Sequence, residues 1–255
     1  MDESPKYAVE ATGTSLRILE TLVDAPESMG VTALSREVDV AKSVVHNHLA
    51  TLRAHGYVTK RNGRYGPSLS LLRLGSGVRS NVGIYQETKE AVDNLAAATG
   101  ETATLFVREE ESAIPIHIAE GDTLWTQPFG VGERLPLHVT APGKCLLASL
   151  SDEDLRTVLD RLNREAYTDA TITDREELTT ELRRVRDDGI SFCRGEHHEG
   201  VVGVAAPIPS NGEYRTAALG VCGPVDRLNG RYLEEDVTGQ VLSTTKSVQV
   251  ELASA

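Results

Sequence analysis

The segment 42–53 combines an apolar stripe and a polar stripe at the spacing of an α-helix. The apolar stripe, at i, i+4 and i+7, consists of Val45, Leu49 and Leu52. The polar and basic residues of the opposite face are Lys42, Ser43, His46, Asn47 and Arg53. Short polar side chains at the amino end of a helix reach base edges in the major groove of B-DNA, and Asn pairs bidentately with adenine. The segment therefore predicts contact with double-stranded DNA.

A second group of cations lies in residues 56–67, around the dipeptide Asn62-Gly63. Both turn residues tolerate positive φ, which makes this dipeptide the strongest short signal for a β-hairpin. The Lys and Arg side chains beside the turn suit phosphates or a narrow minor groove. With Val44 added from the helix, the candidate DNA-binding residues are Lys42, Ser43, Val44, His46, Asn47, Arg53, Lys60, Arg61 and Arg64.

Two more helices are needed to position this helix and hairpin. A helical repeat over 15–23 ends before Pro26, because proline disfavours helix at the residue that precedes it. Thr32 is the expected N-cap of a second helix, and Gly56 is the expected left-handed stop of the third, over 42–55. Residues 1–67 therefore predict a winged helix-turn-helix DNA-binding domain. The alternative is a domain of this shape that binds protein. For His46 and His48, the sequence leaves open whether each side chain packs inward or faces solvent.

The charge of the chain is divided unevenly. The net charge of −12, taken whole, argues against a nucleic-acid partner. Residues 1–75 hold nine cations and eight anions, a net of +1, so residues 76–255 hold −13. Residues 36–73 hold seven cations and two anions, a net of +5, which favours an anionic partner for one end of the chain. Only six of the 26 cationic residues are Lys, against 38 acids, which suggests the hypothesis of a halophilic host.

The composition excludes several classes of protein. An apolar fraction of 40% supports a real core, so a disordered chain is excluded. No apolar run approaches the roughly 18 residues that a membrane helix needs. The first residues lack a basic segment followed by a long apolar one, so we expect no secretory signal and a cytoplasmic protein. Three cysteines do not make a disulfide framework.

The remainder predicts a helical linker over 68–100, which could carry a dimer contact, and a mixed domain over 101–255. Apolar residues at a period of two predict strands over 102–108, 114–119, 124–127, 190–193, 201–208 and 216–222. Asn211-Gly212 predicts a turn between the last two strands, and Pro115 predicts an edge or bulged strand. Helices are expected over 144–149 and 234–250. Two more helices are expected after the capping signals at 151–154 and 173–176. An antiparallel sheet covered by helices is the expected α+β arrangement.

The order of these elements resembles the IclR family of bacterial and archaeal transcriptional regulators, over about residues 15–252. The motifs that carry the resemblance lie at 42–46, 56–58, 132–138, 141–144, 205–207 and 223–224, with Glu196 and Gly200-Val201 between them. The resemblance implies an N-terminal winged helix-turn-helix domain and a C-terminal effector domain of GAF-like or profilin-like α/β shape. It also implies a homodimer or tetramer that senses a small organic metabolite, often a carboxylate or an aromatic acid.

The resemblance also implies an effector pocket. By position it falls on Ala141, Pro142, Gly143, Cys193, Glu196, Val201, Gly203, Gly220 and Cys222. Amide groups at the start of the helix near Pro142 would suit an anionic ligand. Polar Asp and Ser positions of relatives are here Cys193, Gly220 and Cys222, which implies a larger, less polar or differently bound ligand. Asn47 stands where many relatives carry Arg, so the operator sequence is not transferable.

The sequence gives weaker signals for a redox, metal or enzyme site. Cys193 and Cys222 could form a thiol switch or, with His138 or His197, a metal site, but two buried inert cysteines are the simpler interpretation. The segment before Lys144 lacks the first glycine of a P-loop, and no dinucleotide fingerprint or nucleophile elbow occurs. We therefore expect no enzyme activity, cofactor or metal.

The sequence thus predicts a ligand-responsive transcriptional regulator of a metabolic operon, whose metabolite shifts its affinity for a DNA operator. The alternative is a redox-sensing or protein-interaction module whose winged helix contacts protein.

Overall fold

The structure, a computed structural model, describes residues 9–122, 124–210, 212 and 214–254 of the 255-residue chain. The chain divides into two compact units, Met1–Val78 and Arg79–Ala255, and the division falls inside the predicted linker. One apolar cluster forms the core of the first unit, and two clusters form the core of the second. No helix in the described part of the chain is long and apolar enough to cross a membrane.

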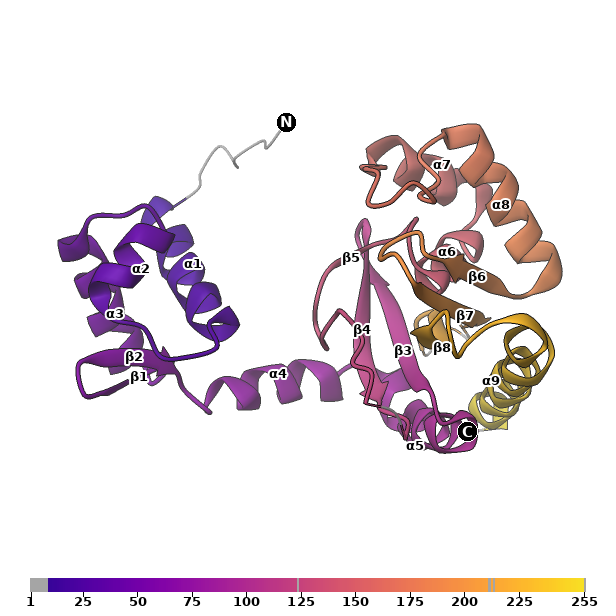
Figure 1. The fold of residues 1–255 in the computed structure, drawn as a ribbon, viewed down its shortest axis with the longest axis horizontal. Helices are drawn as coiled ribbons and strands as arrows, with labels where there is room; N and C mark the ends of the chain where they lie inside the picture. Colours follow the sequence, from indigo (N-terminus) through magenta and orange to yellow (C-terminus); the bar gives the residue numbers. More distant parts are fainter. Residues whose placement is uncertain (1–8, 123, 211, 213, 255) are drawn as a thin grey trace. The chain divides into compact units, whose positions relative to one another are not determined.

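The core of the first unit is built on α1 (Glu10–Asp24), α2 (Val31–Glu37) and α3 (Lys42–Ala54) (Figure 1). Ile18, Leu34 and Val45 have no exposed surface where the helices meet, which confirms the predicted apolar stripes. One expectation is wrong. The N-cap of α2 is Gly30, with no side-chain hydrogen bond, and Thr32 lies inside the first turn. Glycine is accepted at that position almost as well as Thr.

The predicted wing is present. Strands β1 (Val58–Arg61) and β2 (Arg64–Pro67) pair antiparallel, with Arg61 opposite Arg64. Asn62 and Gly63 both have positive φ, 50° and 78°, as a type I′ turn requires. Gly56 also has positive φ and follows the end of α3, as the sequence predicted.

Two helices make up the linker, α4 (Leu71–Ser80) and α5 (Gly83–Thr99). α4 buries none of its residues, whereas α5 buries seven and ends at Gly100 in the left-handed conformation. The linker therefore changes character along its length, from an exposed helix to a helix that belongs to the core of the second unit.

A six-stranded antiparallel sheet in the order β5-β4-β3-β8-β7-β6 forms the second unit. Its strands are β3 (Thr102–Glu109), β4 (Ser112–Ala119), β5 (Leu135–Pro136), β6 (Ser191–Arg194), β7 (Val201–Ile208) and β8 (Ala217–Pro224). The register between β3 and β4 shifts beside Pro115, so the predicted bulge is confirmed.

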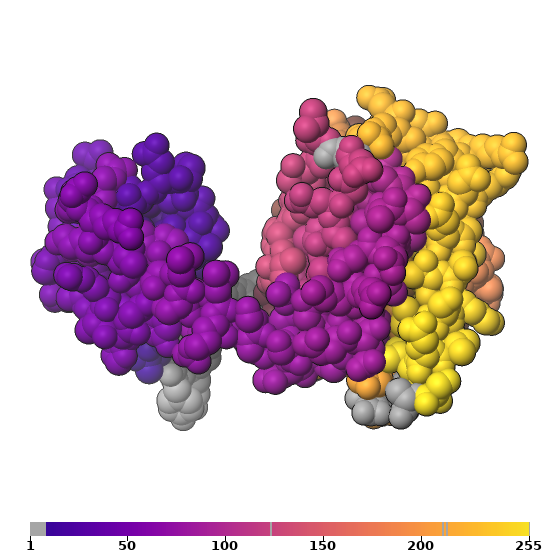
Figure 2. All heavy atoms as spheres, turned by 90° about the horizontal axis from the view of Figure 1, so that it is seen from below, coloured from indigo at the N-terminus to yellow at the C-terminus, as the bar shows by residue number. Residues whose placement is uncertain are grey.

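Helices cover both faces of this sheet, so the predicted α+β class is confirmed. The remaining helical elements are α6 (Ala141–Ala148), α7 (Asp152–Arg161), α8 (Arg175–Asp188), η1 (Tyr232–Val237) and α9 (Thr238–Ser254). α5 and α9 pack on one face, and α6 packs on the other and shares one apolar cluster with α7 and α8. Figure 2 shows α9, in yellow, beside the magenta surface of α5.

Two details differ from the sequence prediction, and a third involves a residue outside the described part of the chain. Residues 124–127 form no strand, and Leu124 is fully exposed. α6 begins at Ala141 instead of 144. Pro142 is accepted in its first turn because N–H groups there have no partner inside the helix, so the missing N–H of proline removes no helical hydrogen bond. The turn predicted at Asn211-Gly212 involves Asn211, which lies outside the described residues.

Candidate functional site

The polar face of α3 is exposed as predicted. Val45 and Leu49 are fully buried, so the opposite side of the helix faces solvent. The exposed residues of α3 and of the wing include all nine predicted for DNA contact, namely Lys42, Ser43, Val44, His46, Asn47, Arg53, Lys60, Arg61 and Arg64. His48 differs from this set because its Nδ1 lies 2.7 Å from the hydroxyl of Ser15 and its ring is half-buried. His46 is exposed and His48 packs, which separates two histidines that the sequence left equivalent.

The wing holds its cations in two ways. Arg64 donates from Nε to the carbonyl of Ser28 at 2.6 Å, and its guanidinium lies 3.9 Å from Glu27. The Lys60 ammonium stands 4.9 Å from the ring centroid of Tyr65. Arg64 thus ties the wing to the loop before α2, while Lys60 and Arg61 present exposed charge beside the turn.

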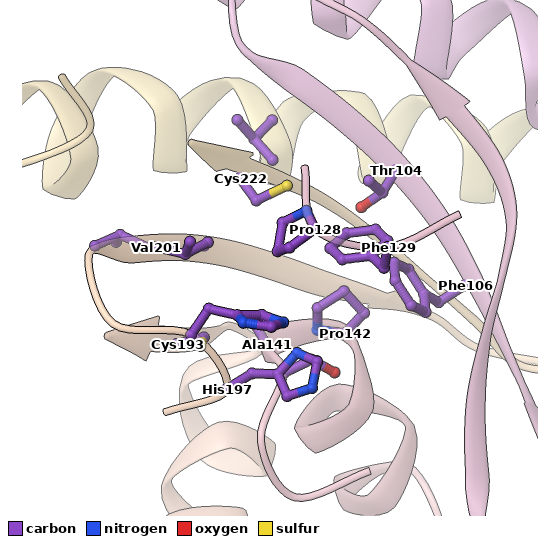
Figure 3. A pocket seen from close by; sticks show the side chains of 15 residues that line it. Thr104, Phe106, Pro128, Phe129, Ala141, Pro142, Cys193, His197, Val201 and Cys222 are labelled. Carbon is purple, nitrogen blue, oxygen red and sulfur yellow. The ribbon is translucent and has the colours of Figure 1, made fainter. Parts of the chain in front are cut away.

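A cavity in the second unit lies between strands β6–β8, the start of α6 and the segment 128–129 (Figure 3). Most of its lining is apolar or aromatic. The lining residues are Thr104, Phe106, Pro128, Phe129, Thr140, Ala141, Pro142, Cys193, His197, His198, Val201, Val202, Gly203, Val221 and Cys222. Six of the nine predicted pocket residues are among them, because β6, β7 and β8 are adjacent and turn the same face toward α6.

The other three predicted pocket residues, Gly143, Glu196 and Gly220, do not line the cavity. A Cβ on Gly143 would stand 2.3 Å from the carbonyl oxygen of Leu137, so this glycine allows α6 to pack closely. A Cβ on Gly220 would stand 2.7 Å from the carbonyl oxygen of Val204. Both glycines are thus required by backbone packing, and their side-chain positions offer nothing to a ligand.

Glu196 forms a buried ion pair with Lys144. The Lys144 ammonium lies 2.8 and 2.9 Å from the two carboxylate oxygens of Glu196 and 3.4 Å from Glu181. Burial raises the pKa of Glu196, and the charge of Lys144 opposes that shift. The sequence showed Lys144 only as part of a motif, because its partner is 52 residues away. The pair joins α6 to the segment after β6 and so fixes one side of the cavity.

The start of α6 is less open to an anion than the sequence implied. Pro142 has no N–H, and the N–H of Gly143 donates to the hydroxyl of Thr140 at 3.0 Å. The N–H of Lys144 donates to the carbonyl of Thr140. Of the N–H groups at this terminus, one is therefore absent, at Pro142, and one is bonded to the N-cap, at Gly143.

The two cavity cysteines flank Gly203. Cys193 pairs with Gly203 on one side, and Cys222 pairs with it on the other. Two strand spacings of about 4.8 Å place their Cα atoms roughly 10 Å apart. A disulfide needs less than about 7 Å, so the register forbids a bond between them without movement of the sheet. Burial raises the pKa of both thiols, that of Cys222 to about 12, which opposes a reactive thiolate.

The aromatic rings that line the cavity were not predicted from the sequence, which indicated His197 only as a possible metal ligand. Phe106 and Phe129 meet edge to face, with centroids 5.7 Å apart. His197 lies 4.1 Å from the ring of His198 and 5.1 Å from that of Tyr167. Burial, followed by the nearby imidazole of His198, lowers the pKa of His197 to about 4. Phe129, Tyr167 and the two histidines lie in irregular segments, where no periodic pattern marks them, whereas Phe106 lies in β3.

No group of three or more His, Cys, Asp or Glu residues able to hold a metal ion occurs within the described ranges. The possible metal site of the cavity cysteines with His138 or His197 therefore has no assembled group of ligands there. His138 is fully buried, and its Nε2 lies 3.1 Å from the carbonyl oxygen of Glu165.

Two regions of the chain match known families. Residues 15–62 match the family described as IclR helix-turn-helix domain, and residues 77–250 match the family described as Bacterial transcriptional regulator IclR C-terminal. The chain is 30% identical over 213 residues to the HTH-type transcriptional regulator XynR of Escherichia coli (strain K12), which covers 83% of this chain and 84% of that protein.

Solved structures show the same fold. The Thermotoga maritima IclR superposes with a TM-score of 0.82 and 22% identity, over 95% of this chain and 98% of that chain. An IclR homolog from Microbacterium hydrocarbonoxydans, complexed with 4-hydroxybenzoate, superposes with a TM-score of 0.80 and 20% identity, over 96% and 100% of the two chains.

Proposed function

The chain belongs to the IclR family of transcriptional regulators, and from this premise we propose that it controls a metabolic operon through an operator contacted by α3 and the wing. As a member of that family it is a DNA-binding regulator with a C-terminal ligand-binding domain. The observation that carries the assignment of surfaces is the joint exposure of Asn47 on α3 and Arg61 on the wing.

The two surfaces have different roles. Asn47 and His46 reach base edges and read sequence, since short polar side chains at the amino end of a recognition helix fit the major groove. Lys60 and Arg61 contact phosphates, which set affinity and register without reading sequence. Arg64 positions the wing through its bond to Ser28 and contributes less charge to the duplex.

A homodimer would place two such surfaces on one operator. α4 and the residue pair before it expose four large apolar side chains, namely Leu69 (83%), Leu72 (66%), Leu74 (40%) and Val78 (71%). Exposed apolar side chains that gather on one helix are typical of an interaction surface. We assign this surface to a second copy of the chain. Leu72→Glu should shift the protein toward monomer in sedimentation analysis, whereas Arg73→Glu, on the neighbouring exposed position, should leave the distribution unchanged.

The cavity of the second unit binds the effector, a small organic metabolite. Its place between the start of α6 and strands β6–β8 supports this, and the similar structure that holds 4-hydroxybenzoate is consistent with a ligand of that size. Regulation requires that the effector bind two arrangements of the dimer with different affinity, since equal binding shifts no equilibrium. The relatives are transcriptional regulators, and the role proposed here involves no catalytic step and takes place in the cytoplasm on chromosomal DNA.

A redox or protein-binding module is the second candidate, and the register of Cys193 and Cys222 argues against its redox form. Fluorescence anisotropy separates the two functions. The full chain should bind a labelled duplex from upstream of its own coding sequence at least about tenfold more tightly than a scrambled duplex of equal composition. Equal binding to both duplexes, or to neither, would refute the regulator assignment.

A further inference from the structure

We propose that Val44 reads the C5 methyl group of a thymine in the operator, close to the base pair that Asn47 contacts. This inference rests on the proposed function, because it names a sequence feature that the DNA-binding surface recognises. Three observations on the described residues carry it: the exposure of Val44 on a polar helix face, its position outside the core, and its spacing from Asn47.

Val44 is an exception among the apolar residues of α3. The other large apolar side chains of this helix, Val45, Leu49 and Leu52, are buried in the core of the first unit. Val44 is 40% exposed and is not among the described residues that form that core. Its exposed neighbours on the helix are polar or basic. Packing against other helices therefore does not account for a valine at this position.

The helical propensity of valine does not account for it either. A β-branched side chain loses rotamer freedom in a helix, so valine is a weaker helix former than alanine. The same stiffness suits a contact residue, because little rotamer freedom remains to be lost on binding. Val44 lies in the first turn of α3, where its N–H donates to the carbonyl of Ala41 at 2.9 Å. A rigid apolar side chain thus stands at the end of the helix that reaches base edges.

A thymine methyl group is the partner that fits an apolar side chain in the major groove. The major-groove edges of adenine, guanine and cytosine carry hydrogen-bond donors and acceptors, and thymine alone adds a methyl group. Contact between Val44 and that methyl group buries apolar surface on both molecules. Against another base, the valine would cover polar groups without giving them a hydrogen bond. Val44 therefore favours thymine and disfavours the other three bases at the position it contacts.

The spacing between Val44 and Asn47 limits where this thymine lies. Side chains three residues apart on a helix lie on the same face, with Cβ atoms about 5–6 Å apart. Successive base pairs are about 3.4 Å apart along the duplex, so the two side chains contact base pairs at most about two steps apart. An Asn that pairs with adenine and a Val that contacts a methyl group together select a short A·T-rich segment in each half-site.

Removal of the methyl groups from the DNA tests the proposal. Fluorescence anisotropy measures the affinity of the full chain for the upstream duplex and for a copy in which uracil replaces every thymine, so that the two differ only in C5 methyl groups. The wild type should bind the uracil duplex at least about fourfold more weakly, the equivalent of about 0.8 kcal/mol for one buried methyl group. Equal affinity for the two duplexes would overturn the proposal.

Two variants of Val44 assign the effect to this side chain. Val44→Thr and Val44→Ser both introduce a hydroxyl group and differ from each other by one methyl group. Val44→Thr should keep a preference for the thymine duplex, whereas Val44→Ser should bind both duplexes equally. Val250→Ala, at an exposed position of α9, is the control and should keep the wild-type preference. A preference that persists unchanged in Val44→Ser would show that another group or the shape of the duplex senses the methyl groups, and would overturn the assignment.

Single replacements test the proposed spacing. The base pair read by Asn47 is the one whose substitution weakens binding by the wild type but not by Asn47→Ala. Uracil introduced at one thymine at a time should reproduce the loss of affinity no more than about two base pairs from that position. A sensitive thymine that lies farther away would contradict the pairing of Val44 with Asn47.

Comparison with the scrambled duplex separates this inference from the proposed function. Selective binding to the upstream duplex without any dependence on thymine methyl groups would refute the inference alone. An absence of selective binding to the upstream duplex would refute the proposed function and the inference with it.

Discussion

Lys144 and Glu196 form a buried ion pair that joins the first turn of α6 to the segment after β6. The side chains are 1% and 9% exposed, and both carboxylate oxygens lie within 2.9 Å of the ammonium. The segment after β6 is also held by the hydroxyls of Thr168 and Thr171, each 2.7 Å from a carbonyl oxygen of Gly195 or Glu196. These bonds hold the base of the cavity independently of any ligand.

Removal of one partner of this pair should destabilise the second unit strongly. Lys144→Met leaves the carboxylate of Glu196 buried without its cation, and we expect a loss of about 3–5 kcal/mol in the free energy of unfolding. Lys144→Met/Glu196→Leu should recover more than half of that loss, because no uncompensated charge remains. Urea denaturation followed by circular dichroism measures both. A double variant less stable than the single one would contradict this reading.

Gly143→Ala should disrupt the packing of α6. The added Cβ would stand 2.3 Å from the carbonyl oxygen of Leu137 and 2.7 Å from the hydroxyl of Thr140. We expect a loss of about 1–3 kcal/mol or more, the cost typical of overpacking. Gly130→Ala is the control, since nothing lies within 4 Å of its Cβ position. Similar melting temperatures for the two variants would contradict the close packing of α6 against the carbonyl of Leu137.

The stability of the second unit should fall as the pH drops below neutral. The pKa of His197 is about 4 in the folded protein and 6.5 as its ordinary value, so the folded state binds fewer protons between these two values. Stability therefore rises with pH across this window and is complete above it. We expect His197 to contribute about 1–2 kcal/mol, less than the full shift implies because the ring is partly exposed.

Thermal melts at pH 6.5 and pH 5 provide the measurement for His197. The wild type should lose more stability over this interval than His197→Gln, which has no imidazole to protonate. If the variant shows the same pH dependence as the wild type, the effect comes from other groups and not from His197. His138 is one such group, since burial also lowers its pKa.

The wing should contribute to DNA affinity through charge. Each phosphate contact adds about −0.9 to the slope of log K against log salt concentration, so Lys60→Ala should make that slope shallower by about one unit on specific and scrambled duplexes alike. Lys89→Ala, which removes an exposed charge from α5, should not change it. A slope that is identical in all three proteins would remove Lys60 from the interface.

The winged helix could be predicted because its signals are local. The stripe of Val45, Leu49 and Leu52 and the turn at Asn62-Gly63 each depend on a few consecutive residues, and the structure confirms both. The cavity depends on how distant segments meet. Its strands were predicted, whereas Phe129 and His197 lie in irregular segments whose positions no periodic pattern determines.

The predicted pocket residues show the same division. Cys193, Gly203 and Cys222 line the cavity together because one register aligns them across β6, β7 and β8. Glu196 was predicted to line the pocket, but its carboxylate binds the Lys144 ammonium instead. This contact depends on a partner 52 residues away in the sequence, which no local pattern indicates.

The central claim is that the exposed face of α3 and the wing bind an operator, and one comparison tests it most directly. The affinities of Asn47→Ala, Arg61→Ala and the control Lys246→Ala are measured on the upstream duplex and on its scrambled counterpart. Asn47→Ala should lose about tenfold or more on the upstream duplex only, Arg61→Ala should weaken both, and Lys246→Ala should change neither. Wild-type affinity in both Asn47→Ala and Arg61→Ala would contradict the assigned DNA surface.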